Sequence, residues 1–322
     1  MRVLVTGAAG LYGIHLVETL AKSDQISKII GIDNFSRPFI LDDPFKIVEN
    51  EEIKKKFELI RMDFRNLDTK TLNNFDLDAV IHLAAYVSIP ESMDNSNEYF
   101  QNNEIGTFTL IHNLFKTKNQ PHFIYASSPE VYGNPIMTPI NIDHPLYPRS
   151  VYAATKLAAE KHCHALWQWH KYPVTIFRNF NTFGENQNNS ADYAAVIPIF
   201  ITRALKNETI FVHNTGEQTR DFMYVKDAVE AYLLAILNRE KALGQILNIG
   251  TGKQTKISDL AFKVKELTNS NSPIVFVKGR SADLQSLEAD ISKTKETLGW
   301  EPKYTLGEGL KRTIDWYRGH LV

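Results

Sequence analysis

The chain begins Met1-Arg-Val-Leu-Val-Thr-Gly-Ala-Ala-Gly-Leu-Tyr-Gly13, and this stretch decides the fold. The apolar, β-branched run before Gly7 predicts a buried strand, and apolar residues at helical spacing after Gly13 predict an amphipathic helix. Gly7 permits a sharp turn, Gly10 lets the backbone approach a pyrophosphate, and Gly13 lets the helix pack closely on the strand. Because a helix N-terminus offers unpaired N–H groups, this loop is predicted to hold phosphate.

An acidic residue completes this pattern. A second apolar strand, predicted over 28–33, ends in Asp33, about twenty residues after the glycine loop, where dinucleotide-binding proteins place an acceptor for the ribose hydroxyls. A carboxylate here repels the 2′-phosphate of NADP and so favours NAD. Arg37 lies close enough in the sequence to complicate that choice. The loop and Asp33 together predict a dinucleotide site.

The composition excludes several classes of function. The 322 residues include 36 Lys and Arg against 37 Asp and Glu, so no basic field favours nucleic acid or an anionic membrane. The single cysteine, Cys163, excludes an intramolecular disulfide and a cysteine-rich zinc site, and we expect it to pack in the core or an interface. The first strand starts at residue 2, and no apolar stretch is long enough to span a bilayer. We expect a soluble, cytoplasmic protein that binds a small molecule and no metal.

Later strands end in residues suited to the same crevice. The strand predicted over 57–62 leads to Asp63 and Phe64, and Asp63 either accepts from an adenine amino group or caps a short helix. The strand over 78–83 leads to Ala84 and Ala85, small residues that let a cofactor ribose lie against the backbone. His82 in that strand is expected to be buried and hydrogen-bonded.

A tyrosine and a lysine follow on a helix that is predicted to begin near Ser150. The i, i+4 spacing of Tyr152 and Lys156 places both on one face of that helix, after a strand over 122–128 that ends in two serines. A tyrosine has a pKa of about 10, and lowering it by about three units requires roughly 4 kcal/mol. A lysine and a nicotinium charge favour the phenolate, so this combination predicts a catalytic site.

These motifs, in this order, resemble the extended short-chain dehydrogenase/reductases, and among them the NAD-dependent nucleotide-sugar epimerases and dehydratases, of the UDP-glucose 4-epimerase kind. The likeness rests on Thr6–Gly13, His82–Ala85, Ser127–Gly133, Tyr152-x-x-x-Lys156, Arg178–Asn181, Arg220–Phe222, Asn248–Gly252, Arg280-x-x-Asp283 and Leu298–Trp300. It therefore covers the whole chain. It implies an α/β fold: a Rossmann-type doubly wound parallel sheet with a smaller C-terminal α/β lobe that binds substrate. The expected domains are 1–177 for NAD and 178–322 for substrate, with part of 225–250 returning to the first.

The resemblance also implies roles for individual residues. Ser128, Tyr152 and Lys156 match the catalytic triad, and Glu130 is a fourth catalytic candidate. Residues implied in cofactor binding are Gly7, Gly10, Leu11, Tyr12, Gly13, Asp33, Asn34, Asp63, Phe64, Leu83, Ala84, Ala85, Asn102, Tyr152, Lys156 and Phe180. Residues implied in substrate binding are Ser88, Ser128, Asn181, Val196, Arg220, Arg280 and Asp283. The two arginines match residues that clamp a diphosphate, for which planar bidentate donors are suited.

The sequence also departs from the family pattern. Leu11 and Tyr12 replace the commoner Phe-Ile of the glycine loop, which changes contacts near the nicotinamide. Glu185 and Asn186 stand where Pro-Arg is usual after Gly184, which changes the local phosphate contacts.

The resemblance implies NAD-dependent inversion of a hydroxyl on a nucleoside diphosphate sugar, at C4 of a UDP-hexose, by a homodimer that pairs helices over 98–115 and 152–171. A dehydratase is the nearest alternative because of Glu130, but Pro129 stands where those enzymes place an aspartic acid. A decarboxylase comes next, although Leu157 replaces its typical arginine. A catalytically silent NAD-binding scaffold is the alternative of another class.

Overall fold

The computed structural model describes residues 1–37, 51–189, 195–279 and 286–321. Seven strands form one parallel sheet in the order β11-β6-β5-β4-β1-β2-β3. They are β1 (Arg2–Thr6), β2 (Lys28–Asp33), β3 (Phe57–Arg61), β4 (Ala79–His82), β5 (His122–Ser127), β6 (Val174–Asn179) and β11 (Ile246–Ile249). The strand order reverses beside β1, where β2 lies on one side and β4 on the other, as in a doubly wound Rossmann-type sheet. The predicted fold class is confirmed.

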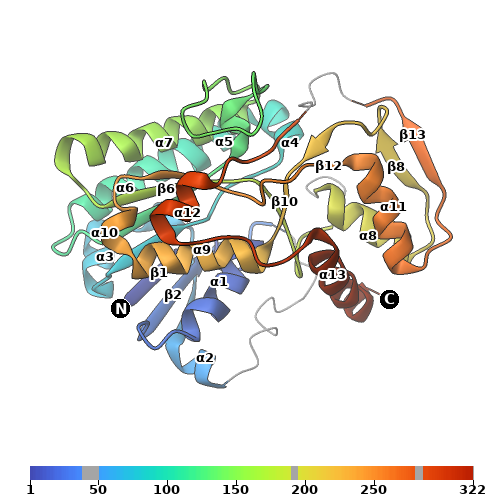
Figure 1. Ribbon diagram of the computed structural model, residues 1–322. Helices are drawn as coiled ribbons and strands as arrows, with labels where there is room; N and C mark the ends of the chain where they lie inside the picture. Colours follow the sequence, from blue (N-terminus) through green and yellow to red (C-terminus); the bar gives the residue numbers. More distant parts are fainter. Residues whose placement is uncertain (38–50, 190–194, 280–285, 322) are drawn as a thin grey trace.

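Helices cover both faces of this sheet (Figure 1). Alternate residues of β1 point to opposite faces, so Val3 and Val5 join one hydrophobic cluster and Leu4 joins the other. The first cluster includes residues of α1 (Leu11–Ala21) and α9 (Val225–Leu237). The second includes residues of α3 (Thr69–Phe75), α6 (Thr107–Phe115) and α7 (Val151–His170), among them the buried Cys163. The expected packing role of this cysteine is confirmed.

The segment expected to be one helix over 98–115 is divided. It consists of α5 (Ser96–Tyr99), the π-helical stretch η3 (Phe100–Gly106) and α6. Wider π turns inside a helix are frequent at functional sites, and no sequence periodicity predicts them. The remaining short elements of this half are α2 (Glu51–Lys56), η2 (Phe64–Asn66), α4 (Ile89–Asp94) and η4 (Pro129–Tyr132).

The C-terminal part builds a smaller α/β lobe, seen on the right of Figure 1. Its strands pair as β7 (Asn181–Phe183) with β10 (Phe222–Tyr224), β8 (Ile210–His213) with β13 (Ile274–Val277), and β9 (Thr219–Arg220) with β12 (Thr255–Lys256). Its helices are α8 (Val196–Leu205), α11 (Ile257–Thr268) and α13 (Leu306–Leu321), while α10 (Arg239–Ala242) and α12 (Ser292–Leu298) lie beside the large sheet. Strand β11 pairs with β6, so the chain returns to the large sheet. The domain limits 1–177 and 178–322 stay a prediction.

The parallel strands bring their carboxyl ends to one edge of the sheet, which is where ligands bind in folds of this type. The glycine loop after β1, Asp33 of β2, Ala84 after β4 and Ser127 of β5 all lie at this edge. In the part of the chain that the structure describes, no helix has the length and apolar character needed to cross a membrane.

Candidate active site

The glycine loop leaves room for a phosphate group. Gly7 has a positive φ of 72°, and a Cβ there would lie 2.8 Å from the backbone nitrogen of Ala84. A Cβ on Gly13 would lie 2.3 Å from the Gly7 carbonyl oxygen, so the close contact of α1 with β1 requires glycine. At Gly10, by contrast, a Cβ would have ordinary contact with the Gly7 oxygen at 3.4 Å and, among the described residues, no other neighbour within 4 Å. No side chain caps the N-terminus of α1, so its N–H groups fit the pyrophosphate of NAD.

Asp33 lies beside this loop. Its carboxylate accepts hydrogen bonds from the backbone N–H of Ala9 at 3.0 Å and of Phe35 at 2.8 Å. Burial raises the pKa of Asp33, and these two hydrogen bonds oppose the shift. Each carboxylate oxygen can accept more than one hydrogen bond, so acceptor capacity remains for ribose hydroxyls.

The predicted catalytic residues meet where β5 ends and α7 begins. Ser150 caps α7 by accepting from the Ala153 N–H at 3.1 Å, which orients the first turn that carries Tyr152. The Ser128 side chain accepts from the Glu130 N–H at 3.2 Å and acts on the Tyr152 phenol, whose pKa it lowers. Both side chains are buried, at 8% and 5% exposure for Tyr152 and Ser128. The structure therefore brings two residues of the predicted triad close together.

The electrostatics of this group differ from the expectation that a lysine lowers the phenol pKa. Burial raises the pKa of Tyr152 to about 12, the Ser128 hydrogen bond lowers it, and the Glu130 charge raises it. Burial also lowers the pKa of Lys156 to about 7, and its Nζ lies 4.4 Å from the centroid of the Tyr125 ring. Desolvation thus outweighs the favourable interactions within the protein. A phenolate here depends on positive charge from bound NAD.

A buried ion pair between Glu160 and Arg178 lies next to this group, and neither residue was among the predicted site residues. Glu160 lies one turn after Lys156 on α7, and its carboxylate accepts from Arg178 Nη2 at 2.5 Å and Nε at 3.1 Å. It also accepts from the Ser127 hydroxyl at 3.0 Å. Arg178 and Glu160 are both almost fully buried. The pair connects α7 to the ends of β5 and β6. Its sequence signal was a glutamate four residues after the lysine.

The loop after β4 is held from two sides. His82 is hydrogen-bonded through Nδ1 to Thr6 Oγ1 at 2.6 Å and through Nε2 to Thr107 Oγ1 at 2.9 Å, and burial lowers its pKa to about 3. Its expected structural role is confirmed. The amide of Asn103, in η3, bonds to the backbone of Tyr86 twice, once to N and once to O, each at 2.9 Å. The π-helical stretch therefore positions the segment that follows Ala84 and Ala85.

The structure also shows the contacts and burial of other residues that are predicted to bind the cofactor. Asp63 caps η2 and pairs with Arg65, which confirms the capping role, while its role toward an adenine amino group stays a prediction. Asn34 donates to Asp63 at 3.2 Å. The Phe64 side chain is buried against the His82 ring, so only its backbone is available to a cofactor. Asn102 is buried and donates to the Asn103 side chain. Leu11, Leu83, Ala84 and Ala85 are half-buried at the carboxyl edge of the sheet.

Tyr12 connects the glycine loop to the smaller C-terminal lobe. Its hydroxyl lies 2.5 Å from Thr182 Oγ1, on β7. Burial raises the pKa of Tyr12, the Thr182 hydrogen bond lowers it, and the nearby Tyr152 raises it further. Phe180, predicted to lie between cofactor and substrate, has its side chain in the hydrophobic core. The neighbouring Asn181 has a buried side-chain oxygen for which the described residues provide no partner.

The predicted substrate residues lie on several elements. Ser88 caps α4 and Val196 is the first residue of α8. Arg220, on β9, donates to the Thr219 carbonyl at 2.8 Å. Arg280 and Asp283 lie outside the described residues. The binding roles of all these residues stay predictions.

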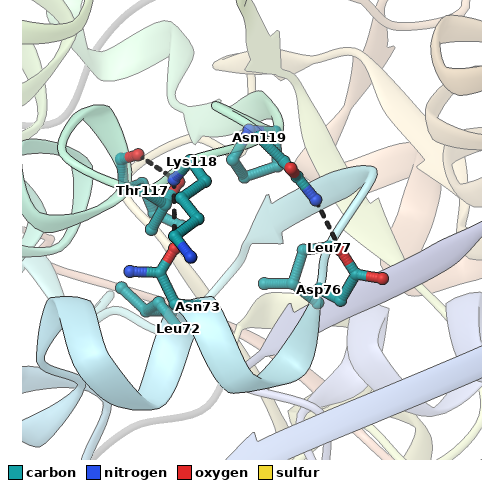
Figure 2. Close-up of a pocket in the computed structure, with 9 residues that line it drawn as sticks. Leu72, Asn73, Asp76, Leu77, Thr117, Lys118 and Asn119 are labelled. Carbon is teal, nitrogen blue, oxygen red and sulfur yellow. Dashed lines mark hydrogen bonds between the residues drawn. The ribbon is translucent and has the colours of Figure 1, made fainter.

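A small cavity lies at the opposite edge of the sheet (Figure 2). It measures about 60 Å³ and is lined by ends of α3 and α6, including Asn73, Asp76 and Lys118. Pockets for small molecules measure about 300–1,000 Å³. Asp76 precedes β4, so this cavity is at the amino edge of the sheet, away from the glycine loop. It is not a candidate for the active site.

A doubly wound sheet, a phosphate-binding glycine loop and a buried Ser-Tyr-Lys group at the carboxyl edge define a dinucleotide-dependent enzyme of the extended short-chain dehydrogenase/reductase class. More narrowly, the chain belongs to the NAD dependent epimerase/dehydratase family, whose model matches residues 3–250. It is thus an NAD-dependent enzyme of the nucleotide-sugar epimerase/dehydratase class, and its cofactor is NAD.

Relatives with different activities resemble the chain along its whole length. It is 32% identical over 319 residues to a putative UDP-glucose 4-epimerase of Methanocaldococcus jannaschii, with 99% of each chain covered. It is 34% identical to a UDP-N-acetyl-alpha-D-glucosaminuronate decarboxylase of Bacillus cytotoxicus, with 98% of each covered. Among solved structures, the UDP-glucuronic acid 4-epimerase of Bacillus cereus, in complex with UDP-glucuronic acid and NAD, superposes with a TM-score of 0.90 at 29% identity, covering 99% of each chain. Similar overall identity is thus shared with enzymes of different reactions, and the residues around Tyr152 distinguish between these reactions.

Proposed function

We propose that this protein epimerises a nucleoside diphosphate sugar, specifically a UDP-hexose at C4. The observation that carries the proposal is the buried grouping of Tyr152 with Ser128, whose hydroxyl lowers the pKa of the phenol, on a helix that also carries Lys156. Pro129 follows Ser128, where a dehydratase needs a proton donor. The relatives that are named as epimerases of UDP-sugars support this substrate class.

Each candidate catalytic residue has a separate role in this reaction. Tyr152 takes the proton of the sugar C4 hydroxyl and later returns it, while Ser128 hydrogen-bonds the same oxygen. Bound NAD supplies the hydride acceptor and donor and, when oxidised, a positive charge beside the phenol. Lys156 binds the nicotinamide ribose, and the burial of Tyr152 and Ser128 limits the access of water to the phenol. Every proton that Tyr152 removes is returned, so substrate and product are isomers.

The side chains after Ser128 disfavour elimination of water. Loss of a hydroxyl needs an acid as well as a base, and Pro129 can supply neither. Glu130 acts electrostatically on Tyr152 and lies in the turn that Ser128 caps, so we assign it to orienting this turn or the substrate. Leu157, next to Lys156, lacks the charge of the arginine that decarboxylases resembling this chain place there.

The test is turnover of a panel of sugar nucleotides in deuterated water, followed by mass spectrometry and NMR. We expect a product of unchanged mass, inverted at C4 and without deuterium at C5. Glu130→Gln should retain epimerisation. Deuterium at C5 or a product lighter by one water, lost in Glu130→Gln, would show a dehydratase. The absence of turnover with every sugar nucleotide would favour the silent NAD-binding scaffold.

We further propose that the protein forms a homodimer through η3, α6 and α7. Large apolar side chains are exposed along this surface, with Phe100 at 40%, Ile105 at 38%, Phe108 at 41% and Trp169 at 84%. Phe108 packs against His162 of α7, with ring centroids 5.1 Å apart. On α7 itself, Leu157, Cys163, Leu166 and Trp167 are packed within the chain, so the exposed surface lies more on η3 and α6. Exposed apolar patches of this kind mark interaction surfaces.

Light scattering at micromolar concentration should therefore give twice the mass of one chain. Phe108→Asp places a charge in the interface and should give a monomer. Phe262→Asp is the matched control, because Phe262 is 56% exposed on α11 and lies on another surface. A monomeric mass for the unmodified protein contradicts the proposal.

A further inference from the structure

We propose that Glu91 determines the preference of this protein for NAD over NADP, by neutralising Arg37. The inference extends the dinucleotide site and rests on the placement of the adenosine ribose at Asp33. In dinucleotide folds an arginine near the end of the second strand accommodates the 2′-phosphate of NADP. Arg37 lies four residues after the last residue of β2, in that region, yet the family uses NAD.

In the structure, the Arg37 guanidinium contacts a carboxylate and an aromatic ring. Arg37 Nη1 donates to Glu91 Oε1 at 2.9 Å, and Nη2 donates to Oε2 at 2.9 Å, which is a bidentate pair. The Arg37 guanidinium also lies over the Tyr86 ring, 4.1 Å from its centroid. Both side chains of the pair are largely buried, at 28% exposure for Arg37 and 14% for Glu91. Bidentate pairs in such surroundings are stronger and better defined than exposed ones.

Other contacts hold Glu91 in this orientation. The Tyr99 hydroxyl donates to Glu91 Oε2 at 2.8 Å and accepts from the Ser88 N–H at 3.0 Å. Ser88 in turn caps α4, the helix that carries Glu91. The carboxylate is therefore positioned before any cofactor binds.

The topology places the pair across the cofactor crevice. Arg37 follows β2 and Glu91 follows β4, and these two strands flank β1 in the sheet. A contact between the segments after β2 and β4 must therefore pass beside the glycine loop that follows β1. This arrangement puts Glu91 on the same crevice as Asp33, although 58 positions separate them in the sequence.

The charges explain the selectivity. A phosphate monoester carries a charge of about −1.5 to −2 at neutral pH. Asp33 and Glu91 each contribute one negative charge and Arg37 contributes one positive charge, so these three groups together repel a 2′-phosphate. Removing the charge of Glu91 brings the sum to zero and takes away the carboxylate that binds the Arg37 guanidinium in a bidentate pair, so the guanidinium attracts the phosphate more strongly. The ribose hydroxyls of NAD carry no charge, so NAD binding should change little.

The test compares NAD and NADP binding by calorimetry in the unmodified protein and in Glu91→Gln, together with the nucleotide that copurifies. In Glu91→Gln we expect NADP to bind about tenfold more tightly, equivalent to about 1.4 kcal/mol, and NAD to change by less than about threefold. Arg37→Ala in the same chain should abolish the gain. Glu91→Ser provides the same comparison if Glu91→Gln does not fold.

Two control variants separate this role from a purely structural one. Glu91→Asp keeps the charge and should not gain NADP binding. Glu18→Gln removes a carboxylate of similar exposure, 18%, on α1. Glu18 is paired with Lys22 and with Lys226 of α9, and the substitution should leave the NAD to NADP ratio unchanged. An unchanged ratio in Glu91→Gln, or a gain that persists without Arg37, overturns the inference. Because binding is measured, these outcomes do not depend on which sugar the enzyme converts.

Discussion

Tyr152→Phe is expected to lower kcat by about 10²–10⁴-fold, the usual contribution of a general base. The substitution removes the phenol hydroxyl, whose pKa the Ser128 side chain lowers, and leaves the ring in place within a buried site. The glycine loop, Asp33 and Lys156 are untouched, so the variant should still copurify with NAD. Turnover of the sugar nucleotide and the NAD content of the purified protein are measured together.

Lys156→Ala should differ from Tyr152→Phe by losing NAD retention as well as turnover, because we assign Lys156 to the nicotinamide ribose. Tyr147→Phe is the matched control, since it removes the same hydroxyl from a side chain that is 74% exposed, and it should leave both measurements unchanged. If Tyr152→Phe kept most of its turnover, the base would have to be a different group.

Glu160→Gln should lower the free energy of unfolding by about 3–5 kcal/mol, because it leaves the positive charge of Arg178 buried without its counter-charge. The pair is almost fully buried, and Glu160 also accepts from Ser127. Urea denaturation measures the effect. A large loss here is expected because desolvating an unpaired guanidinium is unfavourable, not because the pair is a strong net stabiliser.

A double substitution and a control variant test whether the loss of stability comes from the unpaired buried charge. Replacing both partners, as in Glu160→Met with Arg178→Met, should destabilise by less than the sum of the two single substitutions, since neither charge then remains. Glu230→Gln breaks the exposed pair with Lys303 and should cost less than about 1 kcal/mol. A loss of similar size in Glu160→Gln would show that the buried charge is compensated by other groups.

The predicted and observed elements agree best where the chain alternates between apolar runs and glycine or polar breaks. The strands expected over 28–33, 57–62 and 122–128 are β2, β3 and β5, with ends that differ by at most one residue. The type of β2 and β5 was predictable because buried parallel strands are nearly continuous apolar runs, whereas β3 is a partly exposed edge strand that mixes apolar and charged residues. The π-helical turns of η3 were not, since they arise from packing and not from a local pattern.

The same distinction applies to the site. Gly7, Gly10, Gly13 and Asp33 were identified from their spacing because each acts through the local backbone or at the end of a strand. Asp63 was left with two interpretations, and the structure shows it capping η2. Which residues bind substrate was inferred from resemblance alone, and Arg280 and Asp283 lie outside the described residues.

The sequence by itself was enough to predict the doubly wound fold and the dinucleotide loop, and to select Ser128, Tyr152 and Lys156 as catalytic candidates, because these predictions depend on residue type, short spacing and motif order. Only the tertiary structure decided which charges meet. Glu160 faces Arg178 and Glu91 faces Arg37 because parallel strands bring segments from distant parts of the chain to one edge. The tertiary structure also decided the direction of the Tyr152 pKa shift, because burial is its largest cause. Burial depends on every segment that packs around the phenol and not on its neighbours in the sequence.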